Sequence, residues 1–260
     1  MTASDHDLAG SLATAAGELL LDVRAGDFAD VAARRAAGDA GSHRFLVDRL
    51  AVLCAGDAVL SEEGADDRVR LGADRVWIVD PLDGTREFSE RERVDWAVHV
   101  ALWERGELVA GAVALPAEAR TFGTAAPLEV LARPDGPLRL AVSRSRPPAL
   151  VTVLAEQLGA ELVAMGSAGV KAMAVVRGQV DAYVHGGGQY EWDSAAPVAV
   201  ARAAGLHTSR LDGSPLVYNQ PDPWLPDLLI CRSELAGQLL KALAALPADL
   251  TVPRSRGGAA

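Results

Sequence analysis

A short apolar run at residues 76–79 leads directly into the segment Asp-Pro-Leu-Asp-Gly-Thr at residues 80–85. This junction constrains the fold: the residue before a proline avoids the helical region and an Asp-Gly pair favours a turn, so a strand is expected to end there. Asp80 and Asp83 then lie three positions apart, with the Leu82 carbonyl between them. Carboxylate and carbonyl oxygens suit Mg²⁺ or Ca²⁺ better than Zn²⁺. A turn without a ligand uses the same residue types, so this segment alone leaves both interpretations open.

Other carboxylates follow expected elements in a similar way. Glu62 and Glu63 come after a short apolar strand. Adjacent carboxylates repel each other, so one of the two gains from a bound cation, although a solvated acidic loop is the simpler interpretation of the pair taken alone. Asp193 follows Trp192 and opens an expected helix. An N-cap aspartate and a rigidly held metal ligand are both consistent with that position.

Two further features are compatible with a ligand without requiring one. Gly166-Ser167 precedes a helix, where free amides bind phosphate and where a serine N-cap explains the same residues. None of the five histidines has metal-ligand spacing. His99 alternates within an expected strand and is interpreted as structural, and His185 precedes a run of three glycines.

Composition excludes several classes of protein. Half of the 260 residues are hydrophobic and 23% are charged, which excludes a disordered acidic tail. The apolar runs are shorter than the ~20 residues of a membrane span, and the acidic first twenty-five residues argue against a signal peptide. Two cysteines, Cys54 and Cys231, suit a reducing cytoplasm. The net charge of −10 disfavours nucleic-acid polymers and anionic membranes, and at first sight a polyanionic substrate as well.

Hydrophobic periodicity predicts an α/β fold, specifically a layered α+β sandwich with mixed sheets. Helices are expected at residues 8–25, 39–53, 150–158, 168–177 and 194–204. Strands are expected at residues 58–60, 76–79, 94–103, 108–114, 120–122, 129–131, 138–142, 161–165 and 180–184. A turn-rich break near residue 137 divides one catalytic unit, residues 1–250, into a metal-binding α+β subdomain (1–137) and an α/β subdomain (138–250). Residues 251–260 are expected to form a flexible tail.

The ordered combination of motifs resembles a known family. Glu62-Glu63, the run W-I-V-D-P-L-D-G-T-R-E-F at residues 77–88, and W-D-S-A-A at 192–196 occur in the order found in the inositol monophosphatase-like family of magnesium-dependent, lithium-sensitive phosphatases. The resemblance covers essentially residues 5–235. The Thr-Arg-Glu-Phe ending and the segment 142–146 resemble the CysQ branch of that family, the 3'(2'),5'-bisphosphate nucleotidases.

The resemblance implies a set of metal ligands. A first Mg²⁺ is expected to be held by Glu63, Asp80 and the Leu82 carbonyl, and a second by Asp80, Asp83 and Asp193. A third ion is expected to bind weakly near Glu63. Such ions neutralise or invert a local acidic field, which removes the objection that net charge raised against an anionic substrate.

The resemblance also implies catalytic and substrate-binding residues. Thr85, with Asp39 or Glu63, is expected to orient the attacking water. Asp39 departs from the family pattern, because residues 35–38 read Arg-Ala-Ala-Gly where relatives have a Pro-Val-Thr run. The residues expected to face the substrate are Asp83, Gly84, Thr85, Arg144, Gly166, Ser167 and Asp193.

The function implied is removal of the 3'-phosphate of 3'-phosphoadenosine 5'-phosphate, and of its sulfated form, by metal-activated water. The resemblance further implies a role linked to sulfate assimilation, two or three Mg²⁺ per site, inhibition by Li⁺ and a homodimer. Two alternatives remain at this point. One is the same chemistry on inositol monophosphate or fructose 1,6-bisphosphate, and the other is a non-catalytic regulatory binding protein. The complete set of acidic residues argues against the second.

Overall fold

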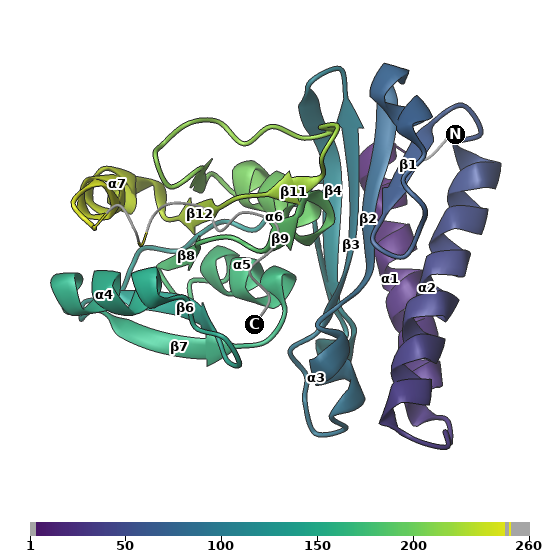
Figure 1. Cartoon of the computed structure of the whole chain (residues 1–260), viewed down its shortest axis with the longest axis horizontal. Coiled ribbons are helices and arrows are strands. Elements are labelled where there is room, and N and C mark those ends of the chain that lie inside the picture. Colours follow the sequence, from purple (N-terminus) through teal and green to yellow (C-terminus); the bar gives the residue numbers. More distant parts are fainter. Residues whose placement is uncertain (1–3, 248–249, 251–260) are drawn as a thin grey trace.

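Alternating layers of helix and sheet build the structure, a computed structural model that describes residues 4–247 and residue 250 (Figure 1). One helical layer covers the first sheet, a second lies between the two sheets, and a third covers the second sheet. In that order the helices are α1 (Asp5–Ala25) and α2 (Val31–Leu53), α5 (Ala168–Val176) and α6 (Glu191–Ala203), and α4 (Ala149–Leu158) and α7 (Ala236–Ala244). The predicted layered α/β class is therefore confirmed.

The first sheet comes from the first half of the chain and has its strands in sequence order. Its strands are β1 (Ala58–Ser61), β2 (Arg75–Asp83), β3 (Ala97–Glu104), β4 (Glu107–Leu115) and β5 (Arg120–Gly123). β1 pairs with β2 in parallel, and the other pairs are antiparallel. The prediction that the strand ends at Asp80 was wrong. β2 continues to Asp83 through a register shift, and such a bulge accommodates the proline that an ordinary ladder would exclude.

The second sheet comes from the second half of the chain and has the order β10-β12-β8-β6-β7. Its strands are β6 (Arg139–Ser143), β7 (Glu161–Met165), β8 (Ala182–His185), β10 (His207–Ser209) and β12 (Leu228–Cys231), and a separate small ladder joins β9 (Gln189–Tyr190) to β11 (Trp224–Leu225). The short helix α3 spans Thr85–Ser89, and 3₁₀ turns span Arg68–Gly72, Pro116–Glu118 and Ser233–Leu235. The mixed pairing of this sheet agrees with the predicted architecture.

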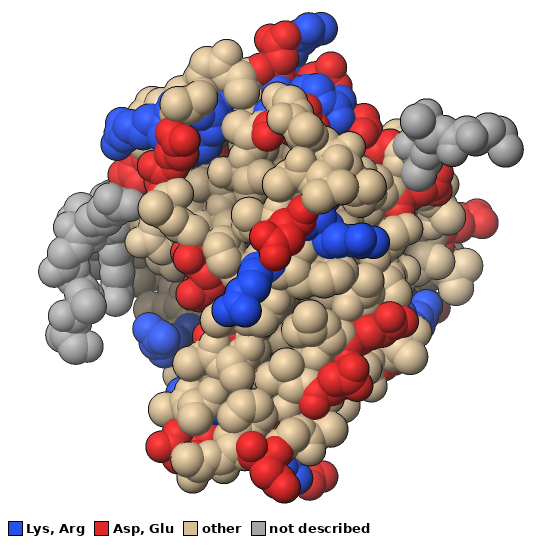
Figure 2. Space-filling model, turned by 90° about the vertical axis from the view of Figure 1, so that its right-hand side faces the viewer, with Lys and Arg blue, Asp and Glu red and all other residues tan. Residues whose placement is uncertain are grey.

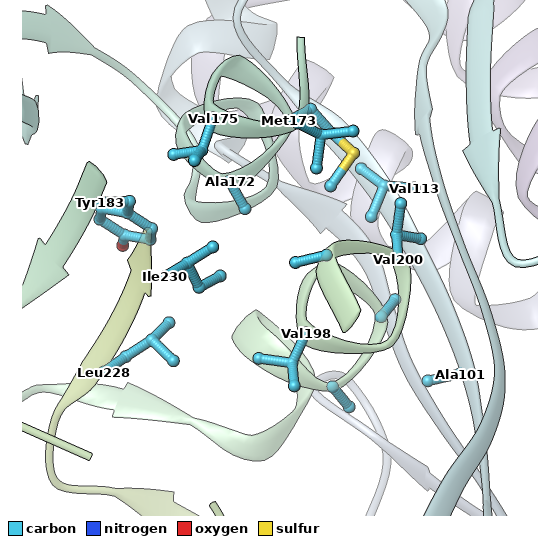
Figure 3. Packing of buried hydrophobic residues seen from close by; sticks show 14 of the residues in the cluster. Ala101, Val113, Ala172, Met173, Val175, Tyr183, Val198, Val200, Leu228 and Ile230 are labelled. Atoms are coloured by element: carbon cyan, nitrogen blue, oxygen red, sulfur yellow. The ribbon is translucent and has the colours of Figure 1, made fainter. Parts of the chain in front are cut away.

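Apolar clusters fill the space between successive layers. The largest lies around α5 and α6, where the side chains of both helices pack against both sheets (Figure 3). Every residue of α5 is buried, as expected for a helix enclosed on all sides. α6 packs against β2, β3 and β4, so a helix of the second half of the chain lies directly on the sheet of the first half.

Three other predictions about the elements were wrong. α2 begins at Val31 rather than at Asp39, because the Asp30 side chain caps the helix by accepting from the Ala33 amide. β3 begins at Ala97 rather than at residue 94. The strand expected at 129–131 is absent, since this segment has no neighbouring strand with which to pair.

The outer surface carries charges of both signs. Figure 2 shows the face formed largely by α1 and α2, where acidic and basic side chains are interspersed among uncharged ones. Among the described residues, no helix is long and apolar enough to cross a membrane. The predicted tail at residues 251–260 lies outside the described residues.

Candidate active site

Three aspartates from the two halves of the chain meet beside the bulge of β2. Asp80, Asp83 and Asp193 each place a carboxylate oxygen so that the three atoms lie within 4.8 Å of one another. The bulge brings the first two together, and the first turn of α6 supplies the third. Asp193 is the third residue of α6 rather than its N-cap, and its carboxylate accepts from the Tyr190 amide at 2.7 Å. That bond fixes one carboxylate oxygen and so orients the side chain.

Asp83 is held in its ionised form by its neighbours. Its Oδ2 accepts from Ser167 Oγ at 2.5 Å and from the Gly169 amide at 2.7 Å, at the N-terminus of α5, and lies 3.2 Å from His99 Nε2. Burial would raise the pKa of Asp83, but His99, Lys171 and the Ser167 hydroxyl outweigh burial and hold the pKa well below its usual range. Burial would lower the pKa of His99, but the contact with Asp83 outweighs burial and raises it.

The pKa values of the other acidic groups near Asp83 are raised, whereas that of Asp83 is lowered. Burial, followed by the charge of Glu62, raises the pKa of Asp80 well above its usual range. The pKa values of Glu62 and Asp193 are each raised to about 7, mainly by burial. Glu62 and Asp80 also interact directly, and the negative charge of Glu62 raises the pKa of Asp80. Burial and mutual repulsion thus disfavour the charged forms of these three carboxyl groups, and a bound cation would stabilise those charged forms.

The two glutamates of the pair influence different aspartates. Glu62, and not its neighbour, is the glutamate that contacts Asp80, while the negative charge of Glu63 acts on Asp39. Glu62 and Glu63 lie in the turn that follows β1. The ligand role that the resemblance implies for Glu63 stays a prediction, and the interaction with Asp80 makes Glu62 a second candidate.

Thr85 and Asp39 meet beside the cluster. Thr85 Oγ1 lies 3.4 Å from Asp39 Oδ1 and 3.2 Å from the Leu82 carbonyl oxygen, and it can donate to either. Burial, followed by repulsion from Glu63, raises the pKa of Asp39 to about 6. Gly84 adopts φ 87°, a left-handed conformation that glycine tolerates, and so lets the chain turn from β2 into α3.

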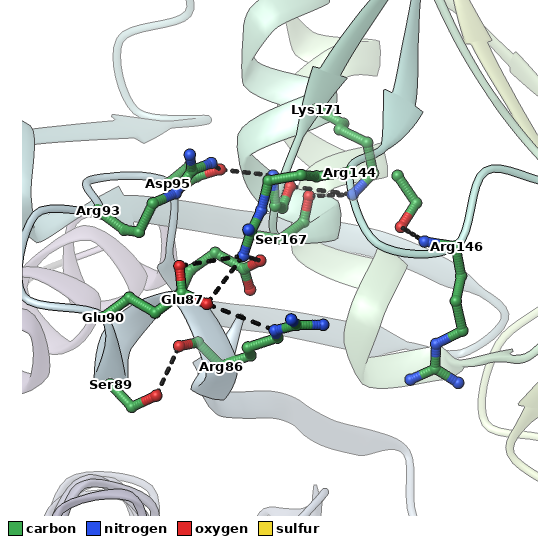
Figure 4. Close-up of polar contacts among 12 residues, drawn as sticks. Arg86, Glu87, Ser89, Glu90, Arg93, Asp95, Arg144, Arg146, Ser167 and Lys171 are labelled. Atoms are coloured by element: carbon green, nitrogen blue, oxygen red, sulfur yellow. Dashed lines mark hydrogen bonds and ion pairs between the residues drawn. The ribbon is translucent and has the colours of Figure 1, made fainter. Parts of the chain in front are cut away.

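Arg144 was expected to face the substrate, but its guanidinium group is hydrogen-bonded to two glutamates. Its Nη2 donates to Glu87 Oε1 at 2.7 Å and to Glu90 Oε1 at 3.2 Å (Figure 4). The neighbouring Gly166 amide donates to Asp95 Oδ2 at 2.6 Å. These bonds tie the loop before α5 to the segment after β2, so Arg144 joins the two halves at the edge of the site.

His99 is a site residue that sequence reasoning missed. Its ring has no exposed surface, and its second nitrogen, Nδ1, lies 3.1 Å from the Trp192 carbonyl oxygen. The imidazole therefore links β3 to the first turn of α6, which carries Asp193, while contacting Asp83. The sequence pattern of β3 did not indicate this role, because the strand is buried on both faces and its alternation does not distinguish a site residue from a core residue.

The side chains fit a hard divalent cation. All the donor atoms are oxygens, with no thiol and no imidazole nitrogen in the aspartate cluster. Three or four carboxyl groups close together also carry more negative charge than buried groups retain without a counter-ion. The arrangement suits Mg²⁺ better than Zn²⁺.

Comparison with known proteins agrees with this geometry. The inositol monophosphatase family model matches residues 6–247. The chain belongs to the inositol monophosphatase family. A "3'-phosphoadenosine 5'-phosphate phosphatase" of Mycobacterium leprae is 54% identical over 252 residues, which cover 91% of this chain and 92% of that protein. A "3'(2'),5'-bisphosphate nucleotidase CysQ" of Escherichia coli strain K12 is 32% identical over 200 residues, 73% of this chain and 81% of that protein.

A solved structure shows the same architecture. CysQ from Bacteroides thetaiotaomicron, described as a bacterial member of the inositol monophosphatase family, superposes with a TM-score of 0.75 at 28% identity. The match covers 87% of this chain and 96% of that structure. Family membership, the layered fold and relatives that are phosphatases therefore agree with one another.

Proposed function

We propose that this protein is a Mg²⁺-dependent phosphatase that removes the 3'-phosphate of 3'-phosphoadenosine 5'-phosphate and of 3'-phosphoadenosine 5'-phosphosulfate. The cluster of Asp80, Asp83 and the partly buried Asp193, beside the Thr85–Asp39 pair, carries the proposal that the site is catalytic. The named activities of relatives 54% and 32% identical support the choice of substrate and the link to sulfate assimilation.

The proposed metal ligands are Asp80, Asp83, Asp193, the Leu82 carbonyl and a glutamate of the Glu62–Glu63 pair. The direct interaction of Glu62 with Asp80 favours Glu62, whereas the resemblance alone had indicated Glu63. Two or three Mg²⁺ bound here would lower the pKa of a water molecule and stabilise the charge on the leaving oxygen.

The protein's own residues would orient the water and accept its proton. Thr85 Oγ1 is placed between Asp39 and the Leu82 carbonyl, where its hydroxyl can fix a water molecule. The pKa of Asp39, raised to about 6, lies close to neutral pH, as suits a general base, and Glu63 lies close enough to assist. Gly84, Gly166, Ser167 and Arg144 are proposed to line the substrate side.

Phosphate release tests the function. We expect turnover of 3'-phosphoadenosine 5'-phosphate that requires Mg²⁺ and falls with added Li⁺, with kcat/KM higher than for inositol monophosphate or fructose 1,6-bisphosphate. The Asp80→Ala variant should lose Mg²⁺-dependent release while remaining folded by circular dichroism. A preference for a sugar phosphate would overturn the substrate assignment. Absence of turnover on all of these substrates would favour a non-catalytic binding protein.

We also propose that residues 1–250 act as one catalytic unit with subdomains 1–137 and 138–250. Asp83 on one side and Asp193 on the other support this view, because neither half contains the whole cluster.

The resemblance supports a homodimer, which light scattering would test. Two free cysteines, Cys54 and Cys231, support a cytoplasmic location.

A further inference from the structure

One face of helix α2 contacts three chain segments that lie next to the acidic cluster. Asp39, Ser42 and His43 are spaced i, i+3 and i+4, so their side chains leave the helix on the same side. The segments reached are the start of α3, the bulge of β2 and the end of β1. The contacts are Asp39 Oδ1 with Thr85 Oγ1 at 3.4 Å, Ser42 Oγ with the Pro81 carbonyl oxygen at 2.7 Å, and His43 Nδ1 with Ser61 Oγ at 2.9 Å.

Ser42 fixes the peptide group in the middle of the bulge. Its side chain is fully buried, and its hydroxyl donates to the carbonyl of Pro81, which lies between Asp80 and Leu82. The orientation of this peptide restricts the torsion angles on both sides of it, and with them the Asp80 side chain and the Leu82 carbonyl. Without the hydroxyl, a buried carbonyl would lose its hydrogen-bond partner, which is unfavourable. The bulge can relieve that cost only by changing its conformation.

His43 holds the loop that follows β1. Ser61, its hydrogen-bond partner, directly precedes Glu62. On the other side of the two glutamates, a Cβ atom on Gly64 would lie 3.3 Å from His43 Cε1, so the ring packs against that end of the loop as well. One imidazole therefore restrains both ends of the segment that contains Glu62 and Glu63.

We propose that Ser42 and His43 are positioning residues that set the affinity of the acidic cluster for divalent cations. This inference rests on the proposed metal-dependent function. Neither side chain is among the proposed ligands. Both act on the backbone that carries those ligands, and α2 is the rigid support that holds three separate segments in register. Hydrogen bonds of this outer kind typically change metal affinity by about ten- to a hundredfold.

Direct binding of Mn²⁺, measured by electron paramagnetic resonance without substrate, tests the proposal. The variants are Ser42→Ala and His43→Leu, which lose the bonds, and His43→Asn, whose amide can take the place of Nδ1. Ser11→Ala, an exposed serine of α1, is the matched control. We expect the Mn²⁺ Kd to rise about tenfold or more in Ser42→Ala and His43→Leu. It should return close to the wild-type value in His43→Asn and stay unchanged in Ser11→Ala.

Kinetics and melting separate positioning from a general loss of stability. The Mg²⁺ concentration for half-maximal phosphate release should rise in parallel with Kd, while kcat at saturating Mg²⁺ changes less. The increase in Tm that Mg²⁺ produces should be smaller in Ser42→Ala and His43→Leu than in wild type. A Kd within twofold of wild type in both Ser42→Ala and His43→Leu, whatever their metal-free Tm, would overturn the proposal. If Ser42→Ala does not fold, the two variants of the half-buried His43, His43→Leu and His43→Asn, decide whether the proposal holds. Wild-type protein that binds no Mn²⁺ would instead contradict the proposed function, and with it this inference.

Discussion

At the scale of single residues, neighbours rather than residue type decide which carboxyl of the site is charged. Asp80 and Asp83 are three positions apart and both buried, yet the pKa of the first is raised and that of the second is lowered. Asp83 faces His99 and the N-terminus of α5, whereas Asp80 faces another carboxyl group. Cations and amide donors favour the charged form, and a neighbouring carboxylate disfavours it.

The Glu62–Glu63 pair gives a first prediction at this scale. Glu62→Gln should raise the Mg²⁺ concentration for half-maximal activity by about tenfold or more, because Glu62 contacts Asp80. Glu63→Gln, the matched neighbour, should change that concentration less and should instead shift the pH profile of kcat to lower pH, because its charge raises the pKa of Asp39. Titration of activity with Mg²⁺ for both variants checks this. The opposite ranking would return the ligand role to Glu63.

His185 gives a prediction about pH and stability. Burial, and then the positive charge of Lys171, lowers its pKa from 6.5 to about 4 in the folded protein. The unfolded chain therefore binds more protons between these values, and the stabilising effect of keeping His185 neutral, full above pH 6.5, is lost as pH falls towards 4. Wild type should lose about 2 kcal/mol more unfolding free energy than His185→Asn between pH 7 and pH 5. Urea unfolding at both pH values measures this, and equal losses would refute it.

At the scale of elements, the close approach of α5 to β2 and β3 builds the site. Asp83 accepts two hydrogen bonds from the first residues of α5, and a Cβ atom on Gly169 would lie only 2.1 Å from His99 Nε2. On Gly166 it would lie 2.4 Å from Glu87 Cγ. The glycines are needed because the start of the helix packs directly against the acidic cluster.

Gly169→Ala should therefore displace the start of α5 and its bonds to Asp83. We expect a loss of about 1–3 kcal/mol of stability from the steric clash, with kcat/KM reduced at least about tenfold as Asp83 moves. Gly10→Ala in α1 is the matched control, since a Cβ there meets no atom within 4 Å and should add up to about 1 kcal/mol. Urea unfolding and phosphate-release assays on both variants test this. Unchanged activity in Gly169→Ala would contradict it.

At the scale of the whole molecule, a buried arginine joins the two halves of the chain. Arg70, with a fully buried side chain, donates to Asn219 Oδ1 at 2.7 Å and to the Gln220 carbonyl at 2.9 Å, and it pairs with Asp66. The amides of residues 219 and 220 in turn donate to Glu191, two positions before Asp193. This network connects the 3₁₀ turn before β2 with the start of α6.

Replacing that arginine should destabilise the protein far more than replacing an exposed one. Arg70→Met leaves a buried amide oxygen and a carbonyl without their donor, and we expect a cost of about 3 kcal/mol. Arg105→Met removes a pair with Asp74 in which both side chains are more than two-thirds exposed, and should leave the urea midpoint close to that of wild type. Equal urea midpoints for the two variants would show that the network contributes little.

The fold could be predicted where local pattern and tertiary environment agree. Strands β1 to β8 and helices α4, α5 and α6 follow from periodicity, whereas helix α7 and strands β9 to β12 were not predicted. Two of the misplaced elements, the start of α2 and residues 129–131, depended on distant contacts. The early turns of α2 contain Gly38, an unfavourable helix residue, yet a Cβ there would lie 2.8 Å from Phe88 Cε1, so packing requires it. Residues 129–131 have strand-like sequence but no partner strand.

The sequence by itself determined the chemical inventory of the site: oxygen ligands at the end of an apolar strand, a threonine after them, and an ordered set of motifs typical of one family. Only the tertiary structure decided which glutamate interacts with Asp80, which aspartate has a raised pKa and which a lowered one, and that His99, Ser42 and His43 support the site. The physical reason is distance along the chain. The amide of Gly169 and the carboxylate of Asp83 are 86 positions apart, and their bond exists only because both are buried together.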